Sequence, residues 1–134
     1  DNGLTFSTPV NLSNNAGGSA PPQISSEGIS VYVTWEDRTT SNANADIFFS
    51  RSNDNGLTFS TPVNLSNNAG ESNGPRISSE RHNVYIIWQD NTAGNFEIFF
   101  ITNNQPFGTF GNTINLSNNA GNSINPQISS STTS

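Results

Sequence analysis

The sequence contains no cysteine, no methionine and no lysine. Without cysteine the chain can form neither a disulfide framework nor a thiolate metal site. Only four residues are basic, against ten acidic residues, and the formal net charge is −6. The basic residues are all arginines: Arg38, Arg51, Arg76 and Arg81. A chain with so few cations has no basic face to neutralise phosphates, which argues against nucleic acid or an anionic membrane as a partner.

Long apolar runs are absent as well. No stretch approaches the roughly 20 apolar residues of a membrane helix, and no signal peptide is recognisable. We therefore expect no membrane insertion. Because even an initiating methionine is missing, we expect a processed chain or a part of a longer protein.

Asparagine, serine, glycine and threonine are abundant, whereas charged residues make up only 10%. The aromatic and β-branched residues occur in short clusters and not diluted through the chain, unlike in disordered segments. Asparagine and serine favour turns, while β-branched and aromatic residues favour strands. The sequence therefore predicts an all-β fold of short strands separated by turns.

The chain repeats itself. Residues 1–17 recur unchanged at 54–70, and the segment NLSNNAG begins at positions 11, 64 and 115. The segments between these copies also correspond, with a deletion of two residues in one loop of the second copy. Equivalent positions are thus 53 residues apart before that loop and 51 residues apart after it.

Each repeat contains four candidate strands. The first is 22–25 or 75–78, the second 31–35 or 84–88, the third 46–49 or 97–100, and the fourth lies within 58–65. The second strand has apolar residues on both faces, with Val33 and Trp35 on one and Tyr32 on the other. Such a strand is covered on both sides.

Four antiparallel strands per unit of about 50 residues, covered on both faces, are typical of β-propeller blades. An immunoglobulin-like sandwich would use about seven non-equivalent strands, and a β-solenoid would have shorter coils. We expect about two and a half blades, whereas a closed propeller needs about 4–8, so other copies or the rest of a longer array would complete the ring. The expected units are a fourth strand with its connection (1–21), two blades (22–74 and 75–125), and a further first strand with a tail (126–134).

The stretch SNDNGLTF at 52–59 resembles the Asp-box, also called the bacterial neuraminidase repeat. The matching positions are Ser52, Asp54, Gly56, Thr58 and Phe59. A first copy keeps Asp1, Gly3, Thr5 and Phe6, and a third keeps Thr109 and Phe110 but has Gln105 and Phe107 in place of the aspartate and glycine. The resemblance implies a sialidase-like propeller or one of its non-enzymatic relatives.

We expect the 52–59 motif to be a structural clasp. Gly56 suits the positive φ of a tight turn, and Asp54 and Thr58 can bond loop amides. In the family this box lies away from the catalytic face.

The resemblance also implies how a catalytic site would be built, with an arginine triad, a tyrosine–glutamate nucleophile and an acid/base aspartate. The only tyrosines, Tyr32 and Tyr85, are equivalent positions in two repeats, as expected for packing. The four arginines fall at non-equivalent positions and suggest no triad, and the single histidine, His82, is expected in a solvated turn. We expect no enzyme within these residues.

Two other sites are candidates. Clustered oxygen ligands suit calcium, and Asp90, Asn91, Asn95 and Glu97 after the second strand form one such cluster, although the same residues can simply cap turns. Asn11, Asn64 and Asn115 each begin an Asn-x-Ser sequon, which indicates glycosylation or a copied turn.

The first interpretation is a non-enzymatic extracellular or cell-surface repeat protein for binding, adhesion or self-assembly, in which repeated surfaces make multivalent contacts with glycans or with other copies. The alternatives are a fragment of a sialidase-like glycoside hydrolase, and a passive spacer or filament subunit.

Overall fold

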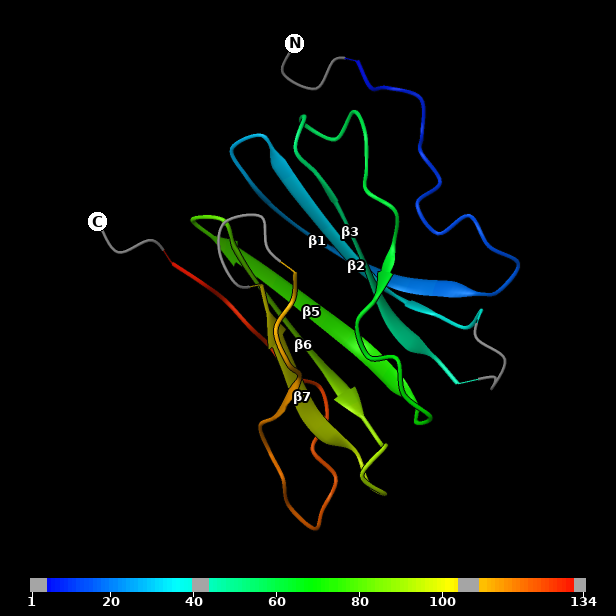
Figure 1. Cartoon of the computed structure of the whole chain (residues 1–134), viewed down its shortest axis with the longest axis vertical. Helices are drawn as coiled ribbons and strands as arrows, with labels where there is room; N and C mark the ends of the chain where they lie inside the picture. Colours follow the sequence, from blue (N-terminus) through cyan, green and yellow to red (C-terminus); the bar gives the residue numbers. More distant parts are fainter. Residues whose placement is uncertain (1–4, 40–43, 104–108, 132–134) are drawn as a thin grey trace.

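A computed structural model of the chain describes residues 5–39, 44–103 and 109–131, which form strands and loops but no helix (Figure 1). This part of the chain accordingly offers no helix that could cross a membrane. Sheet 1 consists of β1 (Ser19–Glu27), β2 (Ser30–Asp37), β3 (Asp46–Ser52) and β4 (Val63–Asn64). Sheet 2 consists of β5 (Ser72–Glu80), β6 (Asn83–Asp90), β7 (Glu97–Thr102) and β8 (Ile114–Asn115).

Both sheets are antiparallel meanders in which each strand pairs with the next along the chain. The expectation of an all-β chain built from four-stranded antiparallel units is therefore confirmed. The β1–β2 turn uses Gly28 at a φ of 57°, whereas the β5–β6 turn places Arg81 and His82 at φ values of 49° and 71°. Positive φ at both central residues is the geometry of the tight hairpin turns that match strand twist.

The first strand of each sheet carries a bulge at the same repeat position. The register of β1 shifts between Ala20 and Gln23, and that of β5 between Asn73 and Arg76. Prolines lie within both shifts, at 21–22 and at 75. Because proline has no N–H to donate to the ladder, the pairing is interrupted there.

The fourth strands are shorter than the sequence indicated. Pairing with the third strand is confined to Val63–Asn64 and Ile114–Asn115. In the first repeat, Pro62 lies directly before the paired residues and has no N–H to extend the ladder. Two-residue outer strands leave little edge on which another chain could pair.

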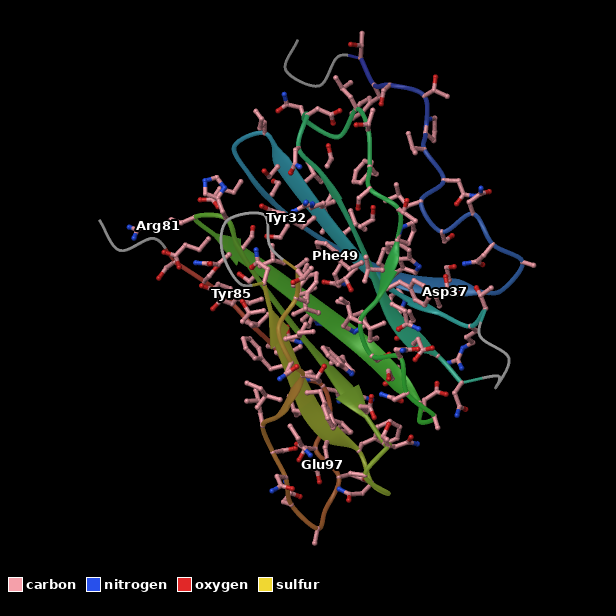
Figure 2. All side chains as sticks on the ribbon, viewed as in Figure 1. Tyr32, Asp37, Phe49, Arg81, Tyr85 and Glu97 are labelled. Carbon is pink, nitrogen blue, oxygen red and sulfur yellow. The ribbon has the colours of Figure 1, made fainter. Side chains whose placement is uncertain are left out.

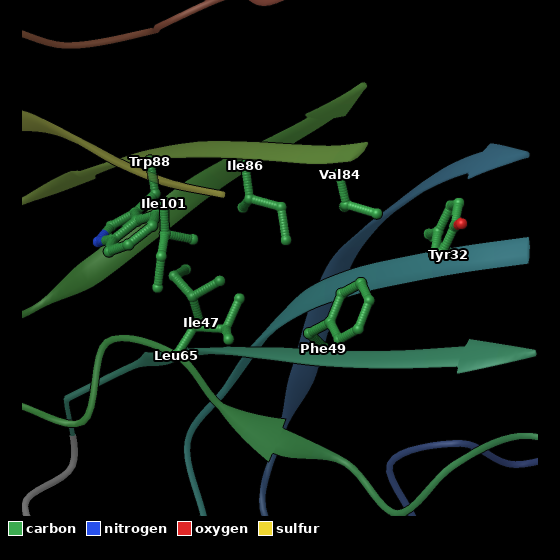
Figure 3. Packing of buried hydrophobic residues seen from close by; sticks show 8 residues of the cluster. All are labelled: Tyr32, Ile47, Phe49, Leu65, Val84, Ile86, Trp88 and Ile101. Atoms are coloured by element: carbon green, nitrogen blue, oxygen red, sulfur yellow. The ribbon is translucent and has the colours of Figure 1, made fainter. Parts of the chain in front are cut away.

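The hydrophobic core lies between the two sheets. Figure 3 shows side chains of one sheet facing those of the other. Sheet 1 contributes Tyr32, Ile47, Phe49 and Leu65, and sheet 2 contributes Val84, Ile86, Trp88 and Ile101. All eight are buried, and Ile86 and Trp88 have no exposed surface.

The two sheets present opposite faces to this core. In sheet 2, the face with Val84, Ile86 and Trp88 packs against sheet 1. In sheet 1, the repeat equivalents of these residues, including Trp35, point away from sheet 2, and Tyr32 points toward it. The packing is therefore head to tail, and each free outer face is a copy of one half of the interface that the chain already forms.

Polar contacts between the two sheets recur between sheet 2 and the C-terminal segment of the chain. Ser25 Oγ of β1 lies 2.7 Å from Ser79 Oγ of β5, and Ser78 Oγ lies 2.6 Å from Ser130 Oγ. Glu36 Oε1 accepts a hydrogen bond from the Gly74 amide at 2.8 Å, and its equivalent, Gln89 Oε1, accepts one from the Asn125 amide at 2.8 Å. Residues 122–131 therefore lie against β5 as β5 lies against β1.

Candidate functional site

The 52–59 loop closes on itself through the side chains of Ser52 and Asp54. Asp54 Oδ1 accepts hydrogen bonds from Ser52 Oγ at 2.6 Å and from the Thr58 amide at 2.9 Å, and its Oδ2 accepts one from Thr58 Oγ1 at 2.5 Å. The Gly56 amide donates to Ser52 Oγ at 2.9 Å, with Gly56 at a φ of 83°. Every residue of this network belongs to the loop itself.

These hydrogen bonds stabilise the ionised form of the carboxyl group. Donation from Ser52 and then from Thr58 lowers the pKa of Asp54 to about 2. A carboxylate with so low a pKa is a poor proton donor or acceptor near neutral pH. The geometry of the loop is therefore that of a clasp.

The other two copies of this motif are described only in part. Asp1, Gly3, Gln105 and Phe107 lie outside the described residues. Thr5 and Phe6 are exposed, and Phe6 is 90% accessible. Phe110, equivalent to Phe59, packs edge-on against Phe49 of sheet 1, with ring centroids 4.9 Å apart. The aromatic residue that ends the motif thus reaches the interface with the preceding sheet.

A second network surrounds Asp90 at the end of β6. Its Oδ2 accepts hydrogen bonds from Ser72 Oγ at 2.6 Å, Asn68 Nδ2 at 2.7 Å and Trp88 Nε1 at 3.3 Å, and its Oδ1 accepts one from the Thr92 amide at 2.8 Å. Burial by itself would raise the pKa of Asp90, but the hydrogen bonds from Ser72, Thr92 and Asn68 outweigh it and lower the pKa. The Asp90 carboxylate therefore fixes the segment that connects the two sheets, which contains Asn68, to the end of β6.

Asp37 has the same surroundings in the first repeat. It accepts hydrogen bonds from Asn15, Ser19, Trp35 and Thr39. Its pKa is lowered because these bonds outweigh the effect of burial. Asp37 and Asp90 occupy equivalent positions of the two repeats. Sequence reasoning missed their partners, although the recurring asparagine and serine of NLSNNAG-x-S were a usable signal.

The calcium candidates belong to separate networks. Glu97 accepts hydrogen bonds from Ser117, from Asn95 Nδ2 at 2.7 Å and from the Asn119 amide at 3.1 Å. Its pKa is lowered, chiefly by the bond from Ser117. Asn91 Oδ1 instead accepts the Glu71 amide at 2.8 Å. Figure 2 shows Glu97 at the lower end of sheet 2 and Asp37, the last residue of β2, in sheet 1.

Within the described residues, no three or more histidine, aspartate or glutamate side chains gather closely enough to hold a metal ion. Calcium binding by Asp90, Asn91, Asn95 and Glu97 stays a prediction. Titration calorimetry with calcium, together with melting in the presence of a chelator, tests it.

The three sequon asparagines adopt one turn geometry. The side-chain oxygens of Asn11, Asn64 and Asn115 accept the amide of the residue three positions on, at 3.0, 2.9 and 3.0 Å. Those residues, Asn14, Asn67 and Asn118, have φ values of 40°, 41° and 39°. Asparagine is among the residues that adopt this left-handed conformation most readily. The repeated segment is thus a turn that leads each sheet into the next, and glycosylation at these positions stays a prediction that intact-mass measurement tests.

The two tyrosines and two of the arginines have nearby structural partners. Tyr32 stacks on Phe49 and Tyr85 on Phe100, with centroids 6.3 and 6.4 Å apart. Arg38 pairs with Glu71 at 2.7 Å, and Arg81 lies 3.9 Å from Glu80. The two tyrosines have the same aromatic partner in each repeat, which matches the packing role expected for them.

A cleft of about 590 Å³ opens between the outer strands of the two sheets. Its floor is apolar and includes Tyr32, Phe49 and Phe110, and its polar rim includes Arg51 and His82. Sequence reasoning did not predict this cleft, because its residues come from both repeats and meet only when the sheets stack.

Comparison with known proteins adds no family assignment. No protein-family model matches the chain, and no curated protein matches it significantly.

Proposed function

We propose that this chain is a non-enzymatic repeat module that functions in assembly, through head-to-tail stacking of its sheets in a propeller-like array. One observation carries the proposal: the contact between β1 and β5 is made again between β5 and residues 122–131. The Ser25–Ser79 and Ser78–Ser130 pairs are equivalent, as are the Glu36–Gly74 and Gln89–Asn125 hydrogen bonds.

The outer face of sheet 2 supports the same proposal. Tyr85, Ile98 and Phe100 are only half-buried, and Leu116 is 57% exposed. Their repeat equivalents Tyr32, Ile47, Phe49 and Leu65 are buried against sheet 2. Apolar patches of this kind mark interaction sites, and the partner that fits this one is a sheet with the Val-x-Val-x-Trp face of β2.

Such an interface is heterologous, since it joins two different faces. A heterologous contact repeats until the rotation closes a ring or continues into a filament. The partners of this module are accordingly further repeats of the same kind, in a longer array or in other copies of the chain. We place the module among the Asp-box repeats and outside the cell, on the resemblance of the 52–59 loop and the lysine-free, asparagine- and serine-rich composition.

A chain with an added third sheet tests the proposal. Ser130 is equivalent to Ser26, so residues 131–134 are replaced by a copy of residues 27–71. We expect urea denaturation to show a higher midpoint for this longer chain than for the original, because the added sheet buries Tyr85 and Phe100.

A matched control carries Val33→Ser and Trp35→Ser in the added copy only, which removes its apolar face. The control is expected to return the midpoint to that of the original chain. Equal midpoints for all three chains would contradict stacking. A fluorogenic sialoside assay on the three-sheet chain separates this role from that of a sialidase-like hydrolase.

A further inference from the structure

The cleft between the sheets has a charge character unlike that of the chain as a whole. The chain has a formal net charge of −6. Nevertheless, the described residues that line the cleft include Arg51 and His82 but no aspartate or glutamate. The nearest carboxylates described lie outside the lining: Glu27 accepts the His82 amide at 3.1 Å, and Asp54 is held by the side chains of Ser52 and Thr58.

Arg51 is held in place through its backbone. Its amide donates to Ser60 Oγ at 3.2 Å, and its carbonyl accepts the Ser60 amide at 2.8 Å. In the antiparallel pairing of β3 with β2, Arg51 lies opposite Tyr32. No hydrogen bond or ion pair joins its guanidinium to another described residue, whereas Arg38 is paired with Glu71. Arg51 therefore presents unused donors at the rim of the cleft.

The floor of the cleft is aromatic. Phe49 and Phe110 meet edge to face with their ring centroids 4.9 Å apart, and Tyr32 stacks beside Phe49. Val84 and Ile101 complete the apolar wall from sheet 2. Such a floor favours a planar apolar group, which can stack on aromatic rings.

Several residues at the rim differ between the two repeats. Four lining positions show this: Arg51 against Thr102, His82 against Ile29, Asn103 against Ser52, and Asn112 against Thr61. Some packing residues are retained, as in the pairs Val31–Val84 and Trp35–Trp88, although the core residue Ile101 stands where the first repeat has Ser50. The departures at the rim give the cleft its arginine and its histidine.

We propose that this cleft is a binding site for a small organic anion with a flat apolar ring. The ring lies against Phe49 and Phe110, and the anionic group receives charge-assisted hydrogen bonds from the Arg51 guanidinium. Small-molecule sites commonly combine an apolar wall with a few fixed polar groups in this way. The described residues that line the cleft all come from one chain, so the proposal does not depend on the assembly role proposed above.

Titration with naphthalene sulfonate tests the site, with uncharged naphthalene methanol as the matched probe. Binding is followed by calorimetry and by amide chemical shifts in an isotope-labelled sample. We expect the sulfonate to bind and to shift the amides of Arg51, Ser60, His82 and Asn103. The uncharged probe is expected to bind more weakly.

The repeat supplies variants that the fold already accommodates. Arg51→Thr introduces the residue found at the equivalent position of sheet 2, and Arg76→Gln introduces the residue found at position 23. Because a hydrogen bond to a charged group contributes about 1.5–3 kcal/mol, Arg51→Thr is expected to weaken sulfonate binding about tenfold or more. Arg76→Gln should leave it within about twofold, and neither variant should alter binding of the uncharged probe.

Three results would overturn the proposal. The first is the absence of sulfonate binding at millimolar concentrations. The second is an equal effect of Arg51→Thr and Arg76→Gln. The third is a set of shifts confined to Tyr85 and Phe100, which would mean that the probe adheres to the uncovered face of sheet 2 and not to the cleft.

Discussion

The indole nitrogen of Trp88 donates a hydrogen bond to Oδ2 of Asp90, two residues further along β6, at 3.3 Å. Trp35 and Asp37 make the same contact in β2 at 3.1 Å. In each pair the indole ring packs on one face of the sheet. The carboxylate accepts hydrogen bonds from the segment that precedes the first strand of the same sheet and from the first residue of that strand. This pairing explains how a chain with few charges keeps successive sheets in a fixed relationship.

Replacement of Asp90 by alanine should therefore destabilise the protein strongly. It removes the acceptor of four donors, from Asn68, Ser72, Trp88 and Thr92, in a site with no exposed surface. Since each unsatisfied buried donor costs about 1–3 kcal/mol, we expect a loss of about 3 kcal/mol or more in the free energy of unfolding. Urea denaturation measures it. Glu80→Ala is the control, because its ion pair with Arg81 is long and near the surface; a loss as small as that of the control would contradict the role of Asp90.

The equivalent phenylalanines Phe49 and Phe100 should respond differently to the same substitution. Phe49 is 5% exposed and lies between the sheets, whereas Phe100 lies on the uncovered face of sheet 2. Phe49→Ala should cost about 3–5 kcal/mol, as is usual for a buried phenylalanine, and Phe100→Ala should cost about half as much or less. Thermal and urea unfolding of the two variants give the comparison. Equal losses would show that the outer face of sheet 2 is already covered in solution.

Three equivalent glycines make a further matched set. A Cβ atom on Gly70 would lie 2.7 Å from the Thr92 backbone nitrogen, and one on Gly17 would lie 2.8 Å from that of Thr39. A Cβ atom on Gly121 would meet nothing closer than 3.6 Å. We expect Gly70→Ala to destabilise the chain by more than about 1 kcal/mol through overpacking and Gly121→Ala to stay within about 0.5 kcal/mol. Differential scanning calorimetry measures both. A severe loss of stability in Gly121→Ala would mean that a further part of the protein packs against Gly121.

The stability of the chain should fall in acid, in part through Asp54. Its pKa is lowered from 3.8 to about 2 by the hydrogen bonds from Ser52 and Thr58. The folded state therefore binds this proton less readily than the unfolded state, so the stabilisation is complete above about pH 5 and is lost as the pH falls toward about 2. In Asp54→Asn this contribution is absent at every pH.

The measurement is the urea midpoint at pH 6 and at pH 3. The difference between the two midpoints should be smaller for Asp54→Asn than for the original chain. If Asp54→Asn showed the full acid dependence, the hydrogen-bonded clasp would not be the source of it.

The repeat made much of the fold predictable. Alternating apolar residues in 31–35 and 84–88 predicted strands covered on both faces. In β2 this is confirmed, since Tyr32 and Trp35 lie on opposite faces and are both buried, whereas Tyr85 of β6 is only half-buried. The 52–59 clasp was predictable for a similar reason: the hydrogen bonds of its Ser52 and Asp54 side chains join residues within four positions of one another. Local sequence determines local geometry of this kind.

The sequence by itself thus determined the strands, their grouping in fours and the turns that separate them, because these depend on side-chain period and short-range hydrogen bonds. Tertiary structure decided the rest. Only stacking brings Phe110 to Phe49, over 61 positions of chain, and only stacking places Arg51 and His82 around one cleft. Two nearly identical repeats therefore acquire different surroundings, since one face of each sheet is covered by its neighbour within the chain and the other is not.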